Sequence, residues 1–189
     1  MKHIFLIALL AVLNVSYASE LELNFDHKFN GNKLGVFPQK HITSAGNTIT
    51  IDRYKYYVGN FQVTYKTGKV YSFPGDYFLI DSEKPQSMRV KLTDLPLGEI
   101  SKVDFGIGVD SLANDAGLMN GDLDPMNGMY WAWNSGFINF KLEGNCISCT
   151  SKKEFKYHLG GFLAPNQTYQ TVALSVRQEI NSSLSVMYL

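Results

Sequence analysis

Three features of this sequence predict an all-β fold, an antiparallel β-sandwich of the Greek-key, immunoglobulin-like type. Apolar and polar residues alternate over many short segments, as they do in half-buried strands. Turn-forming residues separate these segments at the spacing that is typical of sandwiches and barrels. No segment shows a helical pattern of more than about two turns, so strands are expected to build the core.

Length and composition indicate one folded domain over residues 19–189. The chain has 189 residues, of which 45% are hydrophobic and 13% aromatic, enough to bury a single core. Its 17 basic and 17 acidic residues cancel. A neutral chain without long runs of like charge has no electrostatic footprint for nucleic acid or an anionic membrane surface.

Residues 1–18 are predicted to be a secretory signal peptide. A short polar start precedes the apolar stretch from Ile4 to Leu13, and Ser16-Tyr17-Ala18 offers the small residues that signal peptidase requires. The apolar stretch is too short to span a bilayer with margin. The mature protein is therefore expected to begin near Ser19 and to be periplasmic or secreted.

The first strand is predicted where Leu21, Leu23 and Phe25 alternate with polar residues, which places His27 at the end of the same core-facing row. Residues 29–40 are rich in Gly, Asn and Lys and are expected to form a loop. Further strands are predicted at residues 48–51, 54–65, 70–73, 77–80, 87–92, 102–109, 171–176 and 184–187, with turns at 66–69 and 94–98.

Residues 128–144 are predicted to form the central strand. Met129, Trp131 and Trp133 occupy alternate positions, so an extended strand would point all three side chains to one face. Asn134-Ser135-Gly136 is a plausible bend, after which residues 137–142 alternate again.

Residues 110–126 are predicted to be a long loop that presents this strand. A calcium site is an alternative, because calcium takes six to eight oxygen ligands and the loop carries several. The spacing does not match an EF-hand, and Asp and Asn are also ordinary turn residues. The oxygen-bearing residues are Asp110, Asn114, Asp115, Asn120, Asp122 and Asp124.

Cys146 and Cys149 are the only cysteines. In an oxidising compartment a short-loop disulfide is the first expectation. A thiolate metal site is the alternative, although one Cys-x-x-Cys pair supplies too few ligands for structural zinc.

No catalytic motif is present: the sequence contains no Gly-x-Ser-x-Gly, no His-Glu-x-x-His, and no phosphate or dinucleotide fingerprint. The protein is therefore not expected to be an enzyme. His27, His41 and His158 are the histidines after the predicted signal, and two neutral imidazoles can hold cuprous copper. From chemistry alone, ordinary packed or surface positions are the more common explanation of such residues.

A series of motifs resembles the MbnP-like copper-binding proteins, a periplasmic or surface family named after a member that is encoded beside methanobactin biosynthesis. The resemblance covers most of the mature chain in order, and its Trp-x-Trp block followed by His-Leu-Gly is specific. The matching segments are Phe25-Asp26-His27, Tyr56-Tyr57-Val58-Gly59-Asn60, Gly108-Val109-Asp110-Ser111, Gly121-Asp122-Leu123-Asp124-Pro125, Gly128 to Phe137, Lys141-Leu142-Glu143-Gly144 and Tyr157-His158-Leu159-Gly160-Gly161.

This resemblance implies an exported, β-rich protein that holds one copper ion. The histidine ligands would be His27 and His158, with His41 and Met129 as weaker candidates. In studied members a tryptophan next to the metal is oxidised to kynurenine by a dihaem enzyme of the MauG, cytochrome c peroxidase-like type. Carried onto this chain, the oxidised residue would be Trp131 or Trp133. The Cys146/Cys149 pair is not part of the family pattern.

Two other functions remain open: an extracellular carbohydrate-binding or adhesin-like sandwich without metal, and a metal-free structural descendant of the family. Burial of both indoles next to His27 and His158 would favour copper, whereas an exposed coplanar row of aromatic rings would favour glycan. The chain ends within an expected strand at residues 185–189, where relatives continue, so a truncated C-terminus is also expected.

Overall fold

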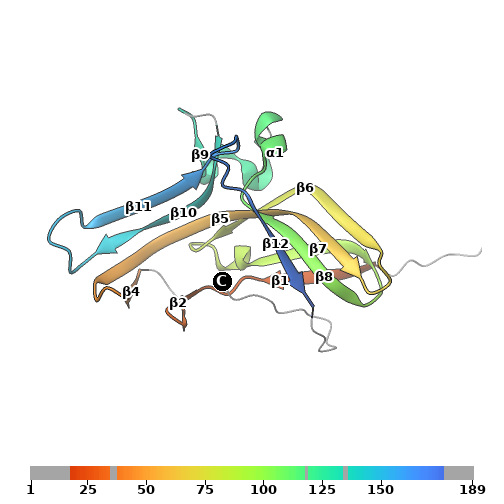
Figure 1. Ribbon diagram of the computed structural model, residues 1–189, viewed down its shortest axis with the longest axis horizontal. Coiled ribbons are helices and arrows are strands. Elements are labelled where there is room, and N and C mark those ends of the chain that lie inside the picture. The colour runs from red at the N-terminus through yellow and green to blue at the C-terminus, as the bar shows by residue number, and fades with distance from the viewer. Residues whose placement is uncertain (1–17, 35–37, 118, 134–135, 177–189) are drawn as a thin grey trace, which may run out of the picture.

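The computed structural model describes residues 18–34, 38–117, 119–133 and 136–176, and these form two unequal β-layers and a separate short hairpin of two strands (Figure 1). The strands are β1 (Ala18–Asn24), β2 (Lys28–Phe29), β3 (Asn32–Lys33), β4 (Gln39–Ile42), β5 (Thr48–Tyr65), β6 (Val70–Asp81), β7 (Arg89–Pro96), β8 (Ile100–Ile107), β9 (Tyr130–Trp131), β10 (Gly136–Cys146), β11 (Glu154–Gly160) and β12 (Gln170–Ser175). Four short helices connect them: η1 (Pro85–Met88), α1 (Ser111–Asp115), η2 (Gly121–Leu123) and η3 (Pro125–Asn127).

Strand β5 is the centre of the larger, eight-stranded sheet. Along one edge it pairs first with β10 and then with β8, and along the other edge it pairs first with β4 and then with β6. Strands β11 and β12 extend the sheet beyond β10 and β8. Because β5 has 18 residues, it joins a wing made with β4, β10 and β11 to a body made with β6, β8 and β12.

The second sheet consists of β1 and β7, which lie across the body of the large sheet and close the main core (Figure 1). Leu21, Leu23 and Phe25 are all buried there, as the alternation in the sequence predicts. Phe25 makes an edge contact with Phe105 of β8, with ring centroids 5.9 Å apart. Burial of apolar surface between the two layers is the main stabilising contribution to such a sandwich.

The opposite face of the large sheet is covered by α1 and β9 (Figure 1) and by η2, whose Leu123 is buried against it. A second, smaller core forms between these segments and the sheet, and Tyr57, Val109 and Met129 are fully buried in it. The region between strands β8 and β9 is therefore packed onto the sheet as short helical turns, and this packing fixes the position of β9.

The all-β antiparallel sandwich is confirmed, as is the hairpin of β5 and β6 around residues 66–69. The expectation of one central strand over 128–144 is wrong for its first half, whereas the alternating segment 137–142 is confirmed as part of β10, which pairs with β5 and β11. Strand β9 contains only Tyr130 and Trp131 and turns back to pair with Gly136 and Phe137, so the Trp-x-Trp segment forms a short hairpin at the sheet's end. The two segments predicted at 48–51 and 54–65 form the single long strand β5, which takes the central place.

Within the described residues, no helix is both long and apolar enough to cross a membrane. The predicted signal peptide, except for Ala18, and the predicted strand at 184–187 lie outside the residues that the structure describes.

Candidate functional site

His27 and His158 lie on opposite faces of the large sheet. In the register of β5, β10 and β11, Tyr54 stands opposite Leu142, which stands opposite Tyr157. These three side chains share one face, and the ring of His27 packs on Tyr54 with centroids 4.6 Å apart. His158 follows Tyr157 in the strand, so it points to the other face. The expected convergence of the two imidazoles on one ion is therefore wrong, because the sheet separates them.

His158 is held by a carboxylate on its own face. Its Nε2 lies 2.7 Å from Oε1 of Glu143 on the neighbouring strand β10. Arg53 approaches the other oxygen of Glu143, with Nε 3.3 Å from Oε2. Burial alone would raise the pKa of Glu143, but the hydrogen bond with His158 and the nearby cations outweigh it and hold this pKa below its usual value. Glu143 is therefore an ionised partner that fixes the orientation of the imidazole.

Trp131 lies on this same face, over Gly160, which is two residues along β11 from His158. A Cβ on Gly160 would lie only 2.5 Å from the Trp131 six-membered ring, so the indole sits directly on the glycine. Gly160 and His158 are two residues apart in β11 and point to the same side. The glycine therefore makes room for an indole on the face that carries His158, two residues further along the strand.

Trp133 is 80% exposed, whereas Trp131 is half-buried and packs against the smaller core. The two indole centroids are 5.6 Å apart and the rings are tilted by 40°. The pair is thus neither fully buried, as the copper expectation required, nor a coplanar exposed row, as glycan stacking would require.

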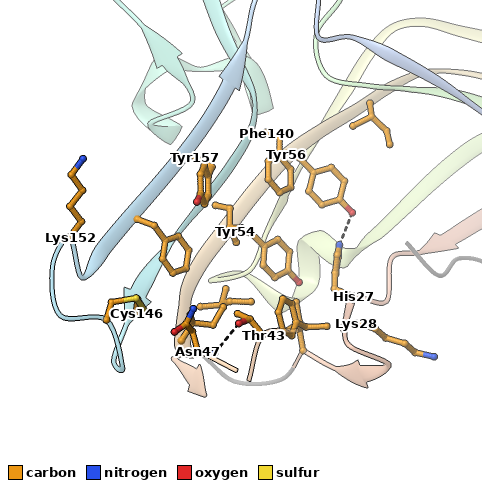
Figure 2. Close-up of a pocket in the computed structure, with 18 residues that line it drawn as sticks. His27, Lys28, Thr43, Asn47, Tyr54, Tyr56, Phe140, Cys146, Lys152 and Tyr157 are labelled. Carbon is orange, nitrogen blue, oxygen red and sulfur yellow. Dashed lines mark hydrogen bonds between the residues drawn. A yellow bond between two sulfur atoms is a disulfide. The ribbon is translucent and has the colours of Figure 1, made fainter. Parts of the chain in front are cut away.

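His27 occupies the wall of an apolar pocket on the opposite face (Figure 2). Its Nε2 lies 2.6 Å from the hydroxyl of Tyr56, and its ring packs between Tyr54 and Tyr56. Burial lowers the pKa of His27 from 6.5 to about 4, and the charge of neighbouring Asp26 compensates only in part. His27 is therefore a neutral imidazole at physiological pH.

The two weaker ligand candidates lie elsewhere. His41 is buried on β4 and packs on Phe29, with ring centroids 4.9 Å apart. Its position opposite Ile49 of β5 places it on the pocket side of the sheet, on the other face from His158. Met129 is fully buried in the smaller core. In the described part of the chain, no group of three or more His, Cys, Asp or Glu side chains is arranged to hold a metal ion.

Cys146 and Cys149 form a disulfide, with their Cα atoms 5.4 Å apart, in the turn between β10 and β11.

Two acidic side chains of the segment 110–126 accept hydrogen bonds from backbone amides. Asp110 accepts a hydrogen bond from the amide of Ala113 as the N-cap of α1, and Asp122 accepts one from the amide of Leu79. These two carboxylates act as caps and braces for the loop.

Sequence reasoning did not identify Glu143, Gly160 or Tyr56 as site residues, although all three lie in the segments that were compared with the family. The signal that could have found Glu143 is the turn at Cys146–Cys149. An antiparallel hairpin around that turn places Lys141 opposite His158, and Glu143 is then the diagonal neighbour of the histidine.

A family model described as MbnP matches residues 18–187 of this chain. A search of the solved structures finds MbnP from Methylosinus trichosporium, with a TM-score of 0.64 and 13% sequence identity; the match covers 89% of this chain and 76% of that chain. At this identity the likeness concerns the fold. No curated protein matches.

Proposed function

The chain belongs to the MbnP family, and from that premise we propose that it is an exported protein that binds a copper ion on the sheet face that carries Trp131 and His158. The ligand set differs from the one that the sequence suggested. His158 contributes the imidazole, and His27 does not contribute, because the large sheet lies between them.

The observation that carries this proposal is the arrangement of Glu143, His158 and Trp131 on one face. Histidines that bind metals commonly donate their second ring N–H to a carboxylate, which fixes the tautomer and makes the ligating nitrogen more basic. If Nε2 of His158 donates to Glu143, Nδ1 keeps its lone pair for a metal. A neutral imidazole is a ligand that suits copper.

Trp131 would complete the ligand set after oxidation. Opening of the indole ring consumes an oxidant, peroxide or dioxygen: two oxygen atoms add across the C2–C3 bond, and hydrolysis then releases C2 as formate. The resulting kynurenine carries a ketone and an aniline nitrogen, which can approach a metal where an indole cannot. We place this change at Trp131 rather than Trp133, because Trp131 lies over Gly160, two residues from His158 in β11, whereas Trp133 is 80% exposed. A partner dihaem enzyme of the MauG type would perform the oxidation, so this chain is its substrate and not a catalyst.

Copper analysis of single histidine variants tests the proposal. The purified mature protein, isolated together with its dihaem partner, is expected to contain about one copper per chain. His158→Ala is expected to remove the metal, because no other imidazole lies on that face among the described residues, whereas His27→Ala is expected to keep it. Equal loss of copper in both variants would indicate that His27 and His158 bind the same ion. The proposal would be contradicted if His158→Ala kept its copper, or if the unaltered protein bound none.

The position of the oxidation can be tested separately by peptide mass spectrometry. Co-expression with the dihaem partner is expected to convert the tryptophan at 131 to a mass that matches kynurenine. Trp133→Phe should retain the modified peptide and Trp131→Phe should lose it. A modification that maps to residue 133 would contradict the assignment, and the copper content of each variant shows whether the metal depends on it.

A further inference from the structure

A large apolar pocket opens on the sheet face opposite the proposed copper site. It lies on the side of the wing formed by β4, β5, β10 and β11, between that wing and the segment around β2 (Figure 2). Its volume is about 660 Å³. Pockets for small molecules commonly have about 300 to 1,000 Å³. The pocket is therefore large enough for an organic ligand.

A bulge in β5 builds the apolar wall. The register with β10 shifts between Arg53 and Ile51, so that Asp52 is an extra residue. An insertion of this kind reverses which side chains face the pocket. As a result the same wall is lined by residues from both sides of the bulge. These are Ile49 and Ile51 before it, and Tyr54 and Tyr56 after it. Without the bulge, the two halves of this wall would face opposite sides of the sheet.

The lining is largely aromatic, and its few charged side chains are of one sign and point outward from the rim (Figure 2). Tyr54, Tyr56, Phe140 and Tyr157 gather around the space, and the His27 side chain closes one side through its hydrogen bond with Tyr56 (Figure 2). Among the described lining residues the charged groups are two lysines, and none is acidic.

We propose that this pocket binds a small amphiphilic molecule with an apolar body and a single anionic head group. The body would lie against the aromatic wall, where burial of apolar surface is favourable. The anionic head would lie at the mouth near Lys152, which follows the disulfide turn and has no ion-pair partner among the described residues; its flexible side chain points outward in Figure 2 and would turn towards the head on binding. His27 stays neutral inside the pocket and so does not attract the head inward.

A matched pair of fluorescent probes tests both parts of the proposal in the intact mature protein. N-phenyl-1-naphthylamine is apolar and uncharged, and 1-anilinonaphthalene-8-sulfonate has the same ring skeleton with one added anionic group. Both are expected to bind saturably at one site, the anionic probe more tightly. Lys152→Glu is expected to weaken the anionic probe about tenfold, since an attraction becomes a repulsion at a solvent-exposed position, and to change the neutral probe less than about twofold.

The location of the probes is tested by two charged substitutions on β11. Tyr157→Asp places a carboxylate in the pocket wall and is expected to weaken both probes. Leu159→Asp is the control, because Leu159 is similarly exposed, 52% against 59%, and lies two residues further on the same face but outside the wall. It should leave both affinities unchanged.

Three results would overturn the proposal: no saturable binding of either probe, equal losses in Tyr157→Asp and Leu159→Asp, or no response of the anionic probe to Lys152→Glu. The proposal does not depend on copper, since the two sites lie on opposite faces of the sheet. His158→Ala is therefore expected to leave probe binding unchanged, and this keeps the two hypotheses experimentally separate.

Discussion

Replacement of Phe61 by alanine is expected to lower the free energy of unfolding by about 3 to 5 kcal/mol, the range for removal of a fully buried phenylalanine. Phe61 is completely buried in the second half of β5, where this strand pairs with β6 and β8. Its ring stacks on Phe105 at 5.4 Å and meets the edge of Phe78 at 5.9 Å. The substitution therefore removes both the buried apolar area and these ring contacts, and it leaves a cavity beside the central strand.

Urea denaturation followed by circular dichroism measures this loss as a lower midpoint at an unchanged slope. Trp133→Ala is the control, because it removes a larger aromatic side chain that is 80% exposed. Its effect should remain within about 0.5 kcal/mol, as for most surface substitutions. Equal losses in the two variants would show that β5 is not the centre of the core.

Local alternation in the sequence was enough to predict the fold class and several strands. Leu21, Leu23 and Phe25 are buried as expected, because a period of two reports directly on which side chains face a core. The order of strands across the sheet could not be obtained in this way. The tryptophan segment has strong strand character and still forms only a two-residue strand, whereas β5 gains the central place through its length. Strand length and pairing depend on contacts between distant segments, which local patterns do not encode.

For the candidate site too, the sequence identified individual residues but not their arrangement in space. The sequence identified His158 and Trp131 individually, and the structure brings them to one face through Gly160. The sequence also identified His27. As predicted, its side chain lies on the same side of the chain as the buried Leu21, Leu23 and Phe25. The error lay in combining His27 with His158, because the face to which each histidine points depends on strand register. A shift of one residue in register reverses that face, and the bulge at Asp52 shows that this sheet contains such a shift.

The stability of the protein is expected to decrease as the pH falls from about 6.5 to about 4, and His27 is expected to cause part of that decrease. In the folded protein burial lowers its pKa to about 4, while in the unfolded chain the imidazole has its ordinary value of 6.5. Between these two values the unfolded chain binds a proton that the folded protein does not bind. The stabilising contribution of the neutral ring is thus complete above pH 6.5 and is lost as the pH falls towards 4.

The expected size is on the order of 1 to 2 kcal/mol, because the full shift must be reduced for the partial exposure of the ring to solvent. His27→Gln isolates this contribution, since an amide can still form a hydrogen bond with the hydroxyl of Tyr56 but does not titrate. His41 and His158 are present in both proteins, so the difference between two urea titrations at pH 7 and pH 4.5 belongs to residue 27. If both proteins lose the same free energy over this interval, His27 is not buried as a neutral ring, and the pocket that it closes must be open to water.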